Sequence, residues 1–282
     1  MAGVPAKPET RGGEPLPGAD VLFLSHCVPN PPDKGERIRA YHEVRFLSAR
    51  YRLHVVCVAR DERERQSARE LEQWCASVRV VDLPPKLALT RALLRFGLGG
   101  CLNTAYFASA ALRRAIDEVM AEAAPVACLA YTAAVAPLVP AGLPLLLDMV
   151  DVDSEKWFQY SRHRFPSVLF AMEARRLRAV ERRLSERASR IWLTTGNEVQ
   201  LYREFAPGAP VASIENGVDG AHFDPNAVVF DSRLDGQSYV VFVGYLDYYP
   251  NRDAVLWFAR EVLPALHRDS NGPRFLVVGG RR

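Results

Sequence analysis

The chain has 282 residues, of which 49% are hydrophobic and 24% are charged, and this composition is typical of a globular protein with a substantial core. Its formal net charge of +3 is too small to indicate a nucleic-acid partner by itself. The five cysteines stand singly, without a Cys-x-x-Cys pair, which argues against a structural zinc site and favours a reducing compartment.

The first residues, 1–18, are rich in proline, glycine and glutamate and contain no apolar run. They predict a disordered tail and not a secretion signal.

After this tail, strand-like and helix-like segments alternate along the chain. The expected strands are 20–25, 53–59, 78–83, 126–131, 145–150, 190–195 and 210–214, and the expected helices are 36–50, 62–76, 108–124, 168–189 and 198–205. This alternation predicts an α/β fold with a complete Rossmann-type parallel sheet and helices on both faces.

A polar tract then separates a second, shorter α/β segment. Strand 239–243, helix 252–265 and strand 275–278 make one βαβ unit, which predicts the start of an incomplete second Rossmann-type lobe. We therefore expect four parts, namely the tail, a first domain at 19–222, a linker at 223–237 and a truncated second domain at 238–282.

One uncharged stretch, residues 123–147, is long enough to cross a bilayer. Four prolines and one glycine interrupt it, however, and fully buried parallel strands also look like continuous apolar runs. The stretch therefore favours two buried strands over a membrane span.

The loop after the first strand contains several candidate binding residues. In a doubly wound sheet, ligands bind outside the carboxyl ends of the strands, and His26 lies at such an end. Lys34, Gly35 and Arg37 can hold a phosphate or sugar hydroxyls near a helix N-terminus. The alternative is a rigid turn with surface arginines and a hydrogen-bonded loop histidine.

A second candidate site is an acidic segment that follows the strand at 145–150. Asp151 and Asp153 can contact sugar hydroxyls, act as a base or hold a divalent cation, or they can cap a helix. No calcium-loop pattern is present, so hydroxyl contacts or capping are favoured and no metal is predicted.

The expected helix at 168–189 is rich in arginine. It either contacts an anionic membrane or a phosphate-bearing acceptor, or it presents an ordinary solvated face. No Gly-x-Gly-x-x-Gly sequence follows the first strand, which argues against a dinucleotide-dependent oxidoreductase.

Four segments together resemble the family-4 retaining glycosyltransferases of GT-B fold, in particular the sugar transferases associated with PEP-CTERM/exosortase and exopolysaccharide gene clusters. The segments are Pro31-Pro32-Asp33-Lys34-Gly35-Glu36-Arg37, Asp151-Val152-Asp153-Ser154-Glu155-Lys156-Trp157, Glu215-Asn216-Gly217-Val218-Asp219 and Val243-Gly244-Tyr245.

The resemblance implies transfer of a sugar from a nucleotide-sugar, with retention, to a glycan or lipid-linked acceptor in exopolysaccharide biosynthesis. It implies that the enzyme uses no cofactor other than the nucleotide-sugar donor. It also implies that the enzyme is cytoplasmic and can lie on the inner face of a membrane. His26, Asp151 and Asp153 become catalytic candidates on the acceptor side. Gly244 and Asn251 become donor-binding candidates, although Tyr245 stands where the family often has an arginine.

The chain departs from this family at its end, because residue 282 comes before the pair of glutamates that the family uses in its nucleotide-binding domain. We therefore expect a fragment that is inactive alone. The alternative is a non-catalytic module that binds an acceptor or acts as a scaffold.

Overall fold

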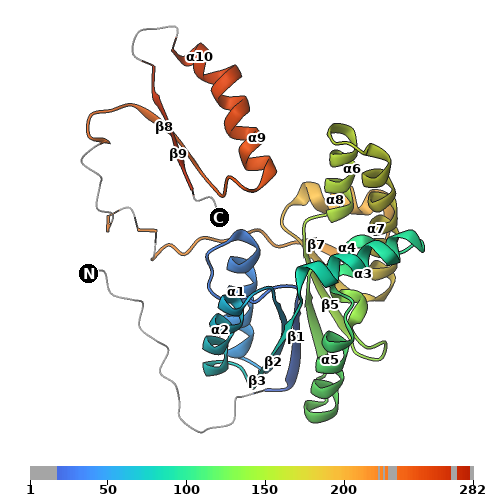
Figure 1. The fold of residues 1–282 in the computed structure, drawn as a ribbon. Helices are drawn as coiled ribbons and strands as arrows, with labels where there is room; N and C mark the ends of the chain where they lie inside the picture. Colours follow the sequence, from blue (N-terminus) through green and yellow to red (C-terminus); the bar gives the residue numbers. More distant parts are fainter. Residues whose placement is uncertain (1–17, 222, 225, 228–233, 268–271, 280–282) are drawn as a thin grey trace. The chain divides into compact units, whose positions relative to one another are not determined.

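The computed structural model describes residues 18–221, 223–224, 226–227, 234–267 and 272–279 (Figure 1). The chain divides into two compact units, Met1–Asn216 and Gly217–Arg282. Each unit has its own parallel sheet.

The predicted tail at 1–18 lies outside the described residues except for Gly18, and the predicted linker at 223–237 is described only in part. The expected domain boundaries, 19–222 and 238–282 with the linker between them, therefore stay predictions.

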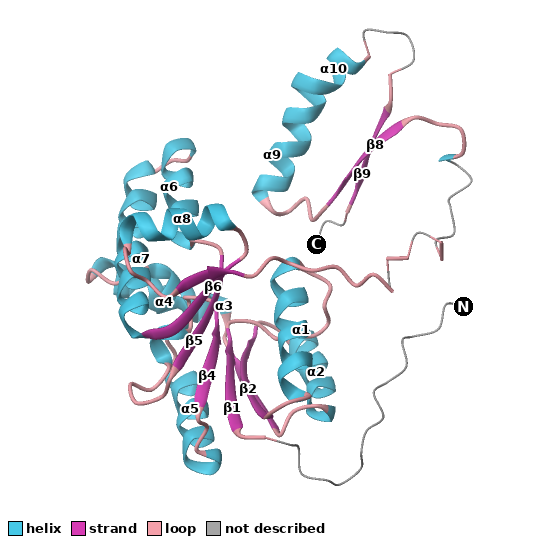
Figure 2. Cartoon of the chain, turned by 180° about the vertical axis from the view of Figure 1, so that it is seen from behind, coloured by secondary structure: helices cyan, strands magenta, loops and turns pink. Residues whose placement is uncertain are grey.

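A seven-stranded sheet forms the centre of the first unit (Figure 2). Its order is β3-β2-β1-β4-β5-β6-β7, and every neighbouring pair is parallel. The strands are β1 (Asp20–Ser25), β2 (Arg52–Ala59), β3 (Ser77–Asp82), β4 (Ala127–Tyr131), β5 (Leu145–Val150), β6 (Ala188–Leu193) and β7 (Val211–Ser213). The uncharged stretch 123–147 thus supplies β4 and the start of β5. Among the described residues, no helix combines the length and apolarity needed to cross a membrane.

Helices cover both faces of this sheet, as predicted (Figure 2). They are α1 (Gly35–Ser48), α2 (Glu62–Ala68), α3 (Pro85–Gly97), α4 (Leu102–Phe107), α5 (Ala110–Ala123), α6 (Asp153–His163), α7 (Ser167–Arg187) and α8 (Gly196–Phe205), with the 3-10 turns η1 (Arg69–Gln73) and η2 (Ala136–Leu138). Alternate residues of β1 enter different cores, because strand side chains point to opposite faces. Phe23 belongs to the core that includes Val44 of α1, and Leu24 belongs to the core that includes Ile116 of α5.

The strand order reverses between β1 and β4. From β1 the chain builds outward through β2 and β3 on one side, and it then returns to place β4 to β7 on the other side. Ligands of open parallel sheets bind outside the carboxyl ends of the strands at such a reversal. The loops after β1, β4 and β5 are therefore the first place to look for a site.

Several helices differ from the sequence-based expectation. The helix predicted at 62–76 is shorter, because α2 gives way to the 3-10 turn η1. The helix predicted at 108–124 starts later, since the Ser109 hydroxyl caps α5. Helix α3 forms within the segment 86–100, for which no element was predicted, and Pro85 in its first turn favours that start.

The second unit is a βαβ arrangement of two strands and one helical segment. Strands β8 (Tyr239–Val243) and β9 (Arg274–Val278) pair in parallel, with Tyr239 opposite Arg274 and Val243 opposite Val278. Between them lie α9 (Tyr249–Trp257), the π-helical turn η4 (Phe258–Val262) and α10 (Leu263–Leu266). The helix therefore begins three residues before the predicted start at 252, because Pro250 fits its first turn.

The backbones at the ends of β8 and β9 approach each other so closely that glycine is required there. We therefore expect the stability of this unit to depend on these glycines. A Cβ on Gly279 would lie 1.9 Å from the carbonyl oxygen of Gly244. Gly279→Ala should therefore push the strand ends apart and cost about 1–3 kcal/mol. Hydrogen exchange of β8 and β9 amides should accelerate about tenfold or more, while exchange in β1 stays unchanged.

Gly220→Ala is the matched control, because a Cβ there meets no atom within 4 Å. Equal exchange rates in the two variants would contradict the prediction.

Candidate active site at the carboxyl edge of the first sheet

His26 directly follows β1 and lies at the strand reversal. Its Nδ1 is 3.2 Å from the carbonyl oxygen of Tyr131 and 3.4 Å from the hydroxyl of Thr132, at the end of β4. The imidazole stacks on the Tyr131 ring and meets the Phe107 ring edge-on. A carbonyl oxygen only accepts hydrogen bonds, so this contact requires the proton on Nδ1 and leaves Nε2 for another partner.

That partner in the structure is Glu36, in the first turn of α1. Its carboxylate lies 3.8 Å from Nε2 of His26 and accepts a hydrogen bond of 2.8 Å from the Arg60 guanidinium. The neighbouring His26 side chain, opposed by burial and supported by Arg60, holds the pKa of Glu36 well below its usual range. An ionised carboxylate therefore stands beside Nε2 of the imidazole.

The three residues predicted to bind phosphate or sugar hydroxyls have different surroundings. Lys34 and Gly35 form the start of α1, and a Cβ on Gly35 would meet no atom within 4 Å, so the backbone there is open to approach. Arg37 is instead buried, and its guanidinium pairs with Glu64 and, at 3.2 Å, with Asp33. Its predicted role stays a prediction, while its contacts give it a structural role.

Arg39, four residues after Gly35 in α1, joins three parts of the site. Its Nε donates a hydrogen bond of 2.5 Å to the buried carboxylate of Asp148 in β5. Its Nη1 donates to the Ile214 carbonyl at 2.9 Å and to the Asn216 side chain at 3.1 Å, beyond β7. Burial and the neighbouring Asp148 raise the pKa of the Glu43 carboxyl, which lies 3.7 Å from Nε of Arg39.

The acidic segment after β5 turns sharply and starts α6. Val150 adopts a left-handed φ of 68°, and Asp151 is exposed and accepts a hydrogen bond of 3.3 Å from the Thr194 hydroxyl. Asp153 is the first residue of α6. Burial raises the pKa of its carboxyl, opposed by the charges of Lys156 and His26.

Two glutamates from later helices hold this segment in place by accepting backbone hydrogen bonds. Glu181 of α7 accepts hydrogen bonds from the backbone N–H of Ser154 at 2.9 Å and from the Ser154 hydroxyl at 2.5 Å. Glu198 of α8 accepts the N–H of Val152 at 2.6 Å. These carboxylates satisfy backbone donors that a helix start leaves without intrahelical partners.

The predicted donor-side residues lie together in the second unit. Gly244 follows β8, and the Asn251 side chain donates a hydrogen bond of 2.9 Å to the Tyr245 carbonyl. A Cβ on Gly244 would lie 2.7 Å from the Asn251 amide nitrogen. The space beside Gly244 that we expected a phosphate to use is therefore occupied by Asn251.

The first unit thus places His26, Asp151 and Asp153 in segments that follow the carboxyl ends of β1 and β5, at the same edge of the sheet. It adds Glu36 and Thr132, which the sequence did not single out as site residues. Glu36 carried a signal, because it lies in the first turn of the helix that follows the candidate loop. Thr132 carried none, since an apolar stretch gives no hint of its left-handed φ of 80°. Among the described residues, no group of three His, Cys, Asp or Glu side chains is arranged to hold a metal.

No family model matches the sequence, and no curated protein matches it. Among solved structures, the chain is similar to sucrose-phosphate synthase from Thermosynechococcus elongatus, with 14% identity, a TM-score of 0.57 and coverage of 93% of this chain and 62% of that one. It is also similar to Phytolacca americana UGT2 complexed with UDP-2fluoro-glucose and pterostilbene, with 12% identity, a TM-score of 0.47 and coverage of 80% and 60%.

At 14% identity, the likeness to the synthase shows the fold alone, and it confirms the predicted GT-B-like α/β class. The chain spans 62% of the length of that synthase. The UGT2 likeness is too weak to add to this result.

The buried Glu181 predicts a specific loss of stability as pH rises. Burial, partly offset by the Ser154 hydrogen bonds, raises its pKa from 4.5 to about 7 in the folded chain. Between pH 4.5 and 7 the unfolded chain releases a proton that the folded chain keeps, so the free energy of unfolding falls by about 3 kcal/mol. Glu181→Gln should remove this part of the slope in urea-unfolding curves.

Glu186→Gln, on the exposed face of the same helix, is the control and should keep the wild-type slope. If Glu181→Gln loses as much stability as the wild type over this pH window, the loss is not caused by the Glu181 carboxyl.

Proposed function

We propose that the chain is the acceptor-side part of a nucleotide-sugar-dependent glycosyltransferase, with His26 at the centre of its site. The observation that carries this proposal is the placement of His26 at the strand reversal, with Nδ1 fixed by the Tyr131 carbonyl and Nε2 facing the ionised Glu36. Such an imidazole can accept a hydrogen bond from a sugar hydroxyl and take up its proton, with the carboxylate 3.8 Å away balancing the charge.

Asp153 adds a second group to the same edge of the sheet. Partial burial raises the pKa of its carboxyl, and a carboxyl with a perturbed pKa is a typical feature of a functional site. We propose that Asp153 and the exposed Asp151 contact hydroxyl groups of the acceptor. We also propose that Lys34 and Gly35, at the start of α1, bind the acceptor. The similarity to a sucrose-phosphate synthase supports the sugar-transfer class.

The finer assignment rests on the sequence resemblance. It comprises membership of the family-4 enzymes, retention of configuration, a hexose donor, and a glycan or lipid-linked acceptor in PEP-CTERM-associated exopolysaccharide biosynthesis in the cytoplasm. Gly244 and Asn251 are proposed to face the donor. The proposal includes no cofactor other than the nucleotide-sugar.

A non-catalytic acceptor-binding or scaffold module is the second candidate function. The observation in its favour is the Asn251 amide, which fills the space beside Gly244 where a donor phosphate was expected. A donor-binding unit would need Asn251 to turn away or to contact the phosphate itself.

The enzymatic proposal predicts a large effect of His26→Asn. Asparagine keeps a short donor for the Tyr131 carbonyl but removes Nε2. For the His26→Asn variant, kcat/KM for sugar transfer should fall about 100-fold or more, as expected for loss of a proton acceptor. Radiolabelled transfer from a nucleotide-sugar to the acceptor provides the measurement.

His163→Ala, at an exposed position of α6, should leave the rate within about twofold of the wild type. If His26→Asn keeps full activity with its thermal stability unchanged, His26 has no catalytic role. If the wild-type protein binds acceptor but transfers no sugar from any nucleotide-sugar, the interpretation as a non-catalytic module replaces the enzymatic one.

We also propose peripheral contact with an anionic membrane through α7, but with fewer arginines than the sequence suggested. Arg176 donates to the carbonyls of Phe96 and Gly100, and Arg178 contacts Ser154 and Glu155. The exposed arginines on and next to this helix are Arg175, Arg182, Arg183 and Arg190.

The double substitution R182Q/R183Q should weaken salt-sensitive co-flotation with anionic vesicles about 30-fold, since each arginine near such a surface contributes about 1 kcal/mol. Wild-type protein that does not co-float at low salt would exclude this contact.

A further inference from the structure

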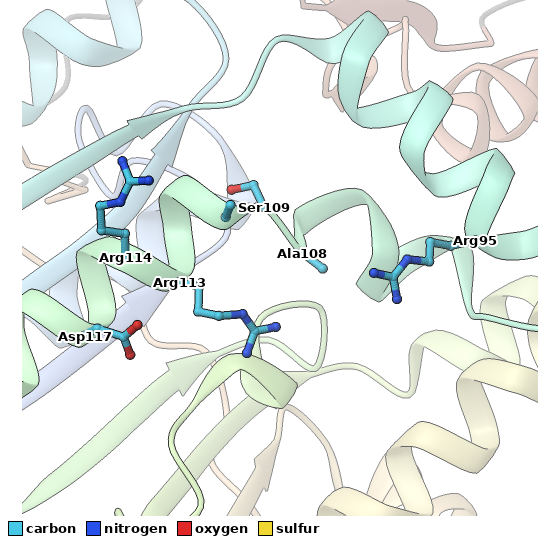
Figure 3. A pocket seen from close by; sticks show the side chains of 7 residues that line it. Arg95, Ala108, Ser109, Arg113, Arg114 and Asp117 are labelled. Carbon is cyan, nitrogen blue, oxygen red and sulfur yellow. The ribbon is translucent and has the colours of Figure 1, made fainter.

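A pocket of about 500 Å³ lies between α3, α4 and α5, outside the residues assigned above. Its walls include Arg95, Ala108, Ser109, Arg113, Arg114 and Asp117 (Figure 3). Three arginines against one aspartate give the pocket a net positive charge. A volume of this size accommodates a small organic ligand.

Two of the arginines point into the same space from different helices. Figure 3 shows the guanidinium groups of Arg95, from α3, and Arg113, from α5, directed toward the space between these helices, whereas Arg114 points elsewhere. The guanidinium group of neither Arg95 nor Arg113 makes a hydrogen bond or ion pair with any residue that the structure describes. Converging like charges repel each other, so an anion between them would lower the energy of the arrangement.

Other arginines near the pocket do have protein partners. Arg91, one turn before Arg95, donates to the backbone carbonyls of Ala105 and Tyr106. Arg79 pairs with Glu118 and Glu122 of α5. Arginines that fasten α3 and α5 to their surroundings therefore have protein partners, and the pair that faces the pocket has none among the described residues.

The pocket also continues toward the candidate active site. A smaller cavity of about 180 Å³ shares Arg95, Ala108 and Arg113 with it and extends to Ala134 in the loop after β4. That loop begins with Thr132, whose hydroxyl lies 3.4 Å from His26. On the other wall, Phe107 precedes Ala108 and meets the His26 ring at 5.7 Å between centroids. The lining of the two cavities therefore includes a direct neighbour in the chain of Phe107 and a residue two positions after Thr132, and both Phe107 and Thr132 contact His26.

We propose that Arg95 and Arg113 bind a phosphate group of the acceptor substrate. Guanidinium groups offer forked donors that match phosphate oxygens, and two of them balance the charge of a phosphomonoester dianion. The helical N–H groups at the start of α5, beside Ser109, supply further donors. This inference rests on the proposed function, because it names the chemical class of the acceptor that reaches His26.

The test uses direct binding and requires no donor or turnover. The full chain is titrated with glycerol 3-phosphate by calorimetry, with glycerol as the uncharged control, and in parallel with phosphatidylcholine vesicles that contain or lack phosphatidic acid. Binding should be saturable and salt-sensitive, and Arg95→Gln and Arg113→Gln should each weaken it at least tenfold. Arg63→Gln is the matched control, because this exposed arginine lies on α2, on the other face of the sheet.

Arginine-dependent binding of the soluble ester identifies a soluble phosphorylated acceptor, and binding of the vesicles alone identifies a lipid phosphate. Both results support the inference. It is overturned if neither probe binds, or if Arg63→Gln weakens binding as much as the pocket variants do. Phosphate binding without sugar transfer would contradict the proposed function but not this inference. Sugar transfer with an acceptor KM unchanged in both pocket variants would contradict this inference but not the proposed function.

Discussion

The buried carboxylate of Asp148 is the contact on which the geometry of the carboxyl edge depends. One of its oxygens accepts the Val150 N–H at 3.0 Å, and the other accepts the Arg39 guanidinium at 2.5 Å. Arg39 in turn holds the chain beyond β7 at Ile214. A buried charge without its partner costs several kcal/mol, so α1, β5 and the exit from β7 are constrained to remain in contact. The loops that carry His26 and Asp153 are attached to these elements.

Other carboxylates around the site also accept hydrogen bonds from backbone N–H groups, because a loop at a sheet edge leaves these donors without partners. Glu173 accepts the N–H groups of Leu102 and Asn103 at the start of α4, at 2.7 and 2.8 Å. Glu181 and Glu198 do the same for the start of α6 and the residue before it. Each glutamate comes from a different helix than the one at whose start it accepts the hydrogen bond. The positions of α4 and α6 relative to the sheet are thus fixed by side chains and not only by apolar packing.

The sequence predicted the strands well, since fully buried parallel strands appear as short apolar runs between breakers. The run 145–150 became β5 with those bounds. Helix starts were harder to predict, because a helix such as α3 depends on tertiary packing more than on a capping residue. For the site, strand ends indicated His26 and Asp153. The hydrogen bond of His26 to the Tyr131 carbonyl was not predictable, because it joins residues 105 positions apart.

Arginine shows why composition alone is a poor guide to an anionic ligand. The sequence drew attention to α7, where arginines are most frequent, yet Arg176 and Arg178 are occupied by carbonyl and side-chain oxygens of α3 and α6 and their flanking loops. Arg95 and Arg113 stand in less basic segments and face a cavity. Whether a guanidinium fastens the fold or remains available to a ligand depends on the oxygen atoms within its reach. Helix packing decides that, and the local sequence does not.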